Sequence, residues 1–76
     1  MELKIKDILD NINILKSCIN CHVINHINNR ECVVCGNKSF DYREEAISNS
    51  YEEELNYYVN EEGYSFTEAR NIVLEI

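Results

Sequence analysis

Four cysteines arranged in two close pairs constrain this chain more than any other feature of its sequence. The pairs are Cys18-x2-Cys21 and Cys32-x2-Cys35, and ten residues separate them. Two residues between cysteines allow one tight turn to direct both sulfurs at a single ion, and the spacer is long enough for a hairpin that returns the second pair to the first. Four thiolates at about 2.3 Å form the closed tetrahedral shell of a structural zinc site. The pattern therefore predicts Zn²⁺ as the cofactor, with the ligands Cys18, Cys21, Cys32 and Cys35.

Other uses of four cysteines agree less well with the rest of the sequence. Disulfides require an oxidising compartment, whereas the start of the chain alternates charged and apolar residues, unlike an export signal. No stretch approaches the roughly 20 apolar residues of a membrane span. We therefore expect a cytoplasmic protein with reduced thiols and no membrane contact. A thioredoxin-type redox pair would need a βαβ context, which the chain lacks.

The segments Cys18-Ile19-Asn20-Cys21 and Cys32-Val33-Val34-Cys35-Gly36 resemble the two metal-binding knuckles of zinc-ribbon and rubredoxin-like modules. The resemblance covers residues 17–39 only, and it indicates a metal rather than a biological role. Proteins with similar ribbons include transcription factors, polymerase subunits, ribosomal proteins, metal chaperones and small phage or bacterial regulators. The first knuckle departs from the pattern because His22 stands where a glycine is often seen. The spacing leaves iron open as an alternative to zinc, since rubredoxin-like iron sites use similar turns.

The chain has 76 residues, so we expect a single domain over residues 1–76. A core of this size usually supplies no more than roughly 3–5 kcal/mol of stability. Zinc binding in small fingers contributes on the order of 10–16 kcal/mol. Removal of the metal is therefore expected to unfold at least residues 17–39.

The first half of the chain is predicted to combine a helix with the metal-binding hairpin. In residues 1–16, apolar residues recur mostly at three- and four-residue steps, which predicts a helix from Glu2 to Lys16. Its apolar face is wide enough to make a homo-oligomer plausible. Residues 17–39 lack a helical period, so we expect a zinc ribbon. Its two short strands would be formed by the residues from Val23 to Ile27 and by Cys32–Cys35.

The last segment, residues 40–76, is predicted to be a helical hairpin. Ile47, Tyr51 and Leu55 lie at four-residue steps and continue a stripe to Tyr58 and Val59, while Gly63 follows where a left-handed helix stop is expected. The run Ser65-Phe66-Thr67-Glu68 has the form of a capping box, and we expect the second helix to continue to Ile76. The predicted fold class is therefore small α+β: an N-terminal helix, a four-cysteine zinc-ribbon β-hairpin and a C-terminal acidic helical hairpin.

Negative charge is concentrated in the last segment. The whole chain has a net charge of −7, but residues 41–76 contain ten acids against Arg43 and Arg70. An acidic helical surface favours a basic partner, and basic surfaces inside a cell belong mostly to nucleic-acid machines. The candidate partner-binding residues are five acids and one tyrosine of this segment: Glu52, Glu53, Glu54, Tyr57, Glu61 and Glu62.

Catalysis is not expected from this sequence. A catalytic zinc keeps an open position, whereas four cysteines complete the shell. His22 and His26 lie between the cysteine pairs, where we interpret them as exposed loop residues or hydrogen-bond donors to sulfur. The prediction is a non-catalytic structural-zinc module that contacts another macromolecule. Its concrete form is a small bacterial or phage regulator that binds a protein of the transcription or replication machinery.

The sequence is also compatible with two alternative functions. The first is a nucleic-acid-binding zinc ribbon, in which basic residues near the metal meet the phosphates while Phe40 or Tyr42 stacks on a base. Its basic residues would be Lys16, Arg30, Lys38 and Arg43. The second is metal delivery or redox sensing, which needs a labile site.

Overall fold

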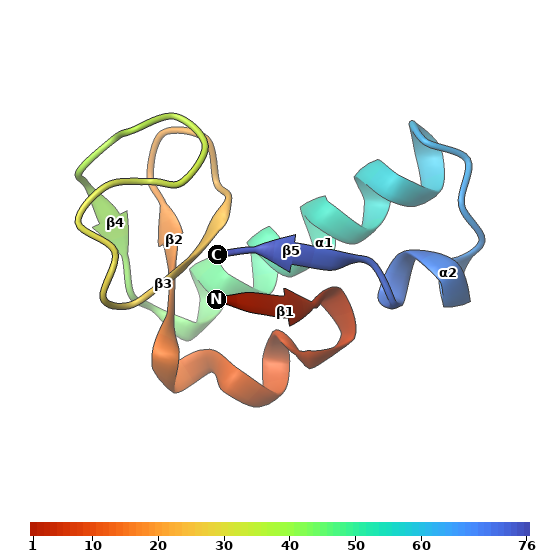
Figure 1. The fold of residues 1–76 in the computed structure, drawn as a ribbon, viewed down its shortest axis with the longest axis horizontal. Coiled ribbons are helices and arrows are strands. Elements are labelled where there is room, and N and C mark those ends of the chain that lie inside the picture. The colour runs from red at the N-terminus through yellow and green to blue at the C-terminus, as the bar shows by residue number, and fades with distance from the viewer.

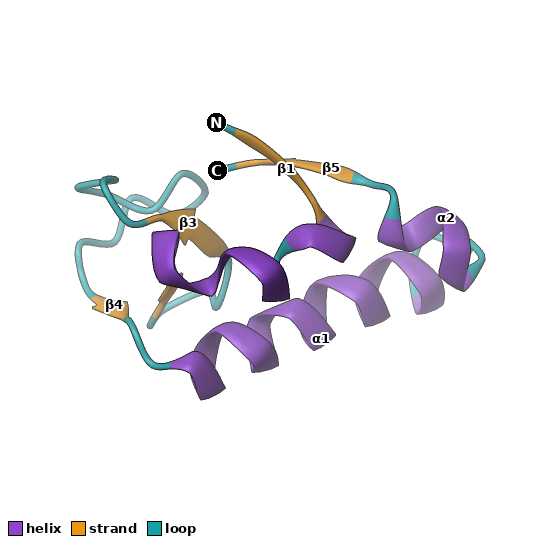
Figure 2. Cartoon of the chain, turned by 90° about the horizontal axis from the view of Figure 1, so that it is seen from below, coloured by secondary structure: helices purple, strands orange, loops and turns teal.

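Helix α1, Glu44–Asn60, is the longest element; several other segments lie along it, and the loops that contain the cysteines lie beyond its N-terminal end (Figure 1, Figure 2). The computed structural model describes residues 1–76, whose principal extents are 32 × 23 × 22 Å. The elements before α1 are β1 (Glu2–Lys4), η1 (Ile5–Asp7), η2 (Leu9–Ile14), β2 (Leu15–Cys18), β3 (Ile24–His26) and β4 (Phe40–Asp41). The elements after it are α2 (Phe66–Arg70) and β5 (Val73–Glu75). The fold is small and α+β, as predicted, but several of its elements differ from the prediction.

Two antiparallel sheets are present. In the three-stranded sheet, β2 lies between β3 and β4, with Lys16 opposite Asn25 and Cys18 opposite Phe40. All four residues of β2 are buried, because α1 packs against the same strand. The second sheet joins the two ends of the chain: β1 pairs with β5, and Leu3 lies opposite Leu74. Figure 1 shows the N- and C-termini side by side at this sheet.

The predicted helix from Glu2 to Lys16 is wrong. Strand β1, the two short 3-10 segments η1 and η2, and strand β2 occupy this stretch. The backbone of Asn11, with φ −127°, interrupts helical geometry, and the Ile5 N–H donates to the Ile72 carbonyl at 3.0 Å instead of within a helix. The apolar spacing does not distinguish an α-helix from a 3-10 helix. A 3-10 helix repeats every three residues, so Ile5 and Ile8 share a face in both kinds of helix. With the helix gone, the apolar face on which self-association was predicted does not exist in that form.

The predicted ribbon hairpin also differs. Strand β3 pairs with β2, not with Cys32–Cys35, which forms a turn. The Gly36 N–H donates to the Cys32 carbonyl at 3.0 Å, and this closed turn is incompatible with an extended strand. Val33 and Val34, which suggested a strand, are instead exposed by 47% and 68%.

The helical hairpin is present only in its first part. Gly63 has φ +76°, and the Ser65–Glu68 capping box is complete, with both hydrogen bonds at 3.2 Å. The second helix then ends at Arg70 instead of continuing to Ile76. Pairing with β1 supplies backbone partners for the last residues, and this tertiary contact overrides their helical spacing. Phe66, the first residue of α2, is 57% exposed.

The hydrophobic core draws on the three-stranded sheet, on both α-helices and on residues next to β1 and β5. Its buried members are Ile5, Ile8, Leu15, Ile24, Ile47, Leu55, Ala69 and Ile76. Tyr51, Tyr58 and Val59 of the predicted α1 stripe pack against this cluster. No helix in the structure combines the length and the apolarity needed to cross a membrane.

Substitution of one buried and one exposed apolar residue tests this arrangement. Ile47 is fully buried in α1, so Ile47→Ala should reduce the free energy of unfolding by about 2–5 kcal/mol. Phe66→Ala should reduce it by less than about 1 kcal/mol, because the ring is already in solvent. Urea unfolding followed by circular dichroism measures both. A larger loss for Phe66→Ala would support the continuous second helix instead.

Candidate metal centre

Two loops at one end of the three-stranded sheet bring the four cysteines together. Cys18 is the last residue of β2, and Cys21 lies in the turn that leads to β3. Cys32 and Cys35 lie in the long loop between β3 and β4, which returns alongside the first loop, where the Ile19 N–H donates to the Ser39 carbonyl at 3.2 Å. All four Sγ atoms lie within 4.8 Å of one another.

The sulfur separations fit a single tetrahedral ion. A metal–sulfur distance of about 2.3 Å places the sulfurs of a regular tetrahedron about 3.8 Å apart. The Sγ atoms of Cys18 and Cys35 are 3.5 Å apart, as are those of Cys21 and Cys32. Cys18 and Cys32 are buried, whereas Cys35 is exposed, so the site opens to solvent on one side. Four thiol groups in this arrangement can hold a metal ion.

The two cysteine turns have the same backbone design. The N–H of the residue after each pair donates to the carbonyl of the first cysteine: His22 to Cys18 at 2.9 Å and Gly36 to Cys32 at 3.0 Å. Both of these residues have left-handed backbones, with φ +63° for His22 and +75° for Gly36. A non-glycine residue at such an angle is uncommon. His22 therefore takes the conformation of the glycine that it replaces, and the departure from the ribbon pattern leaves the geometry of the turn unchanged.

Hydrogen-bond donors at the second cysteine pair favour thiolates. Burial raises the pKa of Cys32, but the Cys35 N–H, the Asn25 amide and the Val34 N–H outweigh it and lower that pKa to about 6. The Asn37 N–H and the Asn20 amide lower the pKa of Cys35. Burial raises the pKa of Cys21 to about 12, although a hydrogen bond from the Val23 N–H acts to lower it. Because the thiolate is the metal-binding form, donors at Cys32 and Cys35 prepare the second pair for an ion.

Asn25 is a supporting residue that sequence reasoning did not single out. Its side chain is completely buried; Nδ2 donates to Cys32 Sγ at 3.5 Å, and Oδ1 accepts from the Val33 N–H at 2.9 Å. Asn29 Nδ2 donates to Asn25 Oδ1 at 3.2 Å and to the Ile76 carbonyl at 2.7 Å. The side-chain amide of Asn25 thus makes hydrogen bonds to both the backbone and a sulfur of the second cysteine turn. The position of an Asn among the apolar residues from Val23 to Ile27 could have indicated a buried polar side chain. The sequence does not, however, identify its hydrogen-bond partners.

Comparison of the chain with protein-family models, with curated proteins and with solved structures finds no match. The fold and the sulfur cluster therefore define the class by themselves. The chain is a small α+β protein with a four-cysteine, zinc-ribbon-like site positioned to bind a metal.

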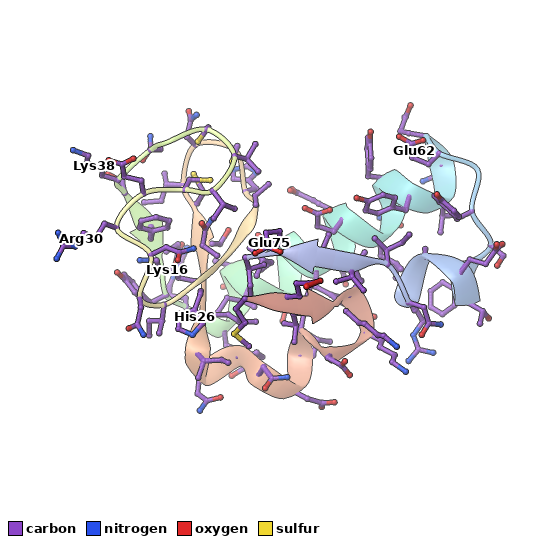
Figure 3. The ribbon with its side chains drawn as sticks, viewed as in Figure 1. Lys16, His26, Arg30, Lys38, Glu62 and Glu75 are labelled. Carbon is purple, nitrogen blue, oxygen red and sulfur yellow. The ribbon has the colours of Figure 1, made fainter.

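The basic residues predicted near the metal separate into internal and exposed ones. Lys16 is 3% exposed; its Nζ donates to the Asn29 carbonyl and lies 3.7 Å from the centre of the Phe40 ring. It is therefore not available to a phosphate, because it stabilises the sheet from inside. Arg43 is occupied by Asp41, with Nη2 and Oδ2 2.7 Å apart. Arg30 and Lys38 are exposed, and Figure 3 shows both at the metal-site end.

The predicted acidic residues do not form one face. Glu52 and Glu53 are exposed, and Glu53 Oε2 lies 3.4 Å from His22 Nδ1. Glu54 is half-buried, and burial, aided by the charge of Glu53, raises its pKa. Since consecutive helix residues point in different directions, these three acids do not share one face of α1. Tyr57 and Glu62 lie at the far end of α1, where the Tyr57 hydroxyl donates to Glu62 Oε1 at 2.9 Å.

Asn25→Asp tests the supporting role of the buried amide. The substitution replaces a donor to Cys32 with a negative charge, so the metal affinity should fall by about 10–100-fold. Asn28→Asp introduces the same charge at an exposed loop position and should change the affinity little. Competition against a chromophoric chelator measures both variants. Equal losses would show that the amide has no specific role at the sulfur.

Proposed function

We propose that this chain is a non-catalytic module in which a structural zinc holds two loops together, and which acts by contacting another protein. The observation that supports zinc binding is the cluster of four sulfur atoms, which all lie within 4.8 Å of one another. A complete shell of four thiolates leaves no open position for a substrate, which favours a structural ion over a catalytic one. A reducing, cytoplasmic setting would keep these thiols available.

The partner surface is proposed to be the acidic segment that follows the metal site. Between Arg43 and Arg70 the chain has eight acids and no Lys or Arg. A surface of this kind repels phosphates and attracts basic proteins, which supports a protein partner. We propose, more specifically, a small bacterial or phage regulator that binds a basic surface of the transcription or replication machinery.

The nucleic-acid alternative loses part of its support in the structure. It relied on four basic residues, of which Lys16 is buried and Arg43 is paired. Arg30 and Lys38 remain, with Lys38 Nζ 4.0 Å from Glu31 Oε1, and two cations give only weak, strongly salt-dependent phosphate binding. The alternative of metal delivery or redox sensing rests on the exposure of Cys35 and requires an ion that leaves while the fold persists.

Metal removal tests the structural role of the ion. We expect one zinc per chain in the purified protein, and we expect a chelator to abolish the NMR signal dispersion of residues 17–39, because the long loop of this segment buries only Cys32. A chelator already saturated with zinc is the control. Dispersed signals in the metal-free protein would contradict a structural role and would favour the labile site. Iron in place of zinc would be evident from the visible absorption of its thiolate complex.

Affinity capture from the native host with mass spectrometry tests the partner. The wild-type protein should recover a basic protein, and the double variant Glu61→Lys/Glu62→Lys should lose it. The matched control, Glu2→Lys/Asp10→Lys, makes the same charge change at exposed positions outside the acidic segment and should keep the partner. Retention by both variants would show that the acidic segment is not the interface. Capture of nucleic acid alone would favour the alternative function.

A further inference from the structure

Three tyrosines gather where α1 ends, at the turn before α2. The rings of Tyr57 and Tyr58 are 5.2 Å apart at an interplanar angle of 81°, and those of Tyr58 and Tyr64 are 6.0 Å apart at 60°. The turn is fixed by the Tyr64 N–H, which donates to the Tyr58 carbonyl at 3.0 Å. Tyr58 is half-buried against the core, whereas Tyr57 and Tyr64 are 48% and 40% exposed. The result is a fixed aromatic surface with two rings open to solvent.

The charges around these rings are all negative. Glu62 accepts the hydrogen bond from Tyr57, and the charge of Glu54 acts on Tyr58. No ion pair of the structure includes Glu54, Glu61 or Glu62. The last turn of α1 also has no basic residue, although the negative end of the helix dipole favours a cation there. In the free protein this end of the helix therefore carries uncompensated negative charge beside exposed aromatic rings.

We propose that this tyrosine cluster, Tyr57, Tyr58 and Tyr64 with Glu54 and Glu62, binds arginine side chains of a basic segment in a protein partner. The inference rests on the proposed function and adds the place of contact and the side chain that is recognised. A guanidinium group is planar, so it can lie on a tyrosine ring while its N–H groups donate to a neighbouring carboxylate. Such a contact would compensate the charge at the end of α1 and cover the exposed rings.

Other occupants match this surface less well. A phosphate backbone or an anionic membrane would be repelled by the acids, and an apolar helix would leave the carboxylates without partners. A lysine ammonium satisfies the carboxylates but lacks the planar group that stacks on a ring. Figure 3 shows Glu62 at one end of the long axis and Arg30 and Lys38 at the other, while the guanidinium of Arg70 in α2 lies over the Phe66 ring, 5.7 Å from its centre. The cluster is therefore free to take a cation from another molecule.

Fluorescence anisotropy with two labelled peptides tests the inference on the zinc-loaded full chain. One peptide alternates arginine with glycine, and the other has lysine at the same positions. The wild-type protein should bind the arginine peptide about fivefold more tightly than the lysine peptide. Tyr57→Leu, which removes a ring but keeps apolar bulk, and Glu62→Gln should each weaken arginine-peptide binding by about fivefold or more.

Matched variants elsewhere on the chain make the result specific. Tyr42→Leu alters a tyrosine that is 58% exposed near the metal site, and Glu52→Gln removes an exposed acid from α1 outside the cluster. Both should keep the wild-type affinity within about twofold, because neither touches the cluster. Thermal unfolding of each variant confirms that its fold is intact.

Two results would overturn the inference in distinguishable ways. Equal binding of the two peptides, with equal losses for Glu52→Gln and Glu62→Gln, would remove the tyrosine cluster but keep the acidic segment as a general electrostatic surface. No binding of either peptide would overturn the inference together with the proposed basic partner. Loss of arginine preference in Tyr57→Leu alone among the tyrosine variants would support it.

Discussion

The approach of four sulfur atoms to one another is the contact on which the metal-site half of the molecule depends. In the loop between β3 and β4, residues 27–39, Cys32 is the one buried residue. Such a loop has almost no apolar contact with which to offset the entropy of ordering its backbone. The Asn25 amide and the sulfur cluster hold it instead. The conformation of this loop therefore depends on these few contacts, and a metal ion bound by the cysteines would strengthen them.

Local signals in the sequence predicted local structure well. The cysteine spacing predicted two metal-binding turns, and Gly63 predicted the end of a helix. Ser65 and Glu68 predicted the capping box. Each depends on residues within about five positions of one another, so the chain carries the information locally. Long-range pairing was not predictable in this way. Nothing near Leu3 indicates Leu74 as its partner, and the apolar spacing at both ends is compatible with a helix and with the observed strands and 3-10 segments.

Candidate site residues show the same division. The cysteines could be chosen from spacing alone, whereas the role of a charged residue depended on its tertiary surroundings. Lys16 looked like part of a basic surface, but its position on the fully buried strand β2 places its ammonium over Phe40. Glu52, Glu53 and Glu54 looked like one acidic run, but helical geometry gives them different environments. The surface that we propose for partner binding is therefore centred on the tyrosines at the end of α1 and not on this run of acids.

The pairing of β1 with β5 has a consequence for the order of events during synthesis. The core includes both Ile5 and Ile76, so it cannot close until residue 76 has left the ribosome. The four cysteines, in contrast, are all present in the nascent chain once residue 35 has emerged. A metal ion can therefore bind and order the cysteine turns while the remainder is still unfolded. Contacts of such high sequence separation form late, and a preformed metal turn shortens the loop that must close.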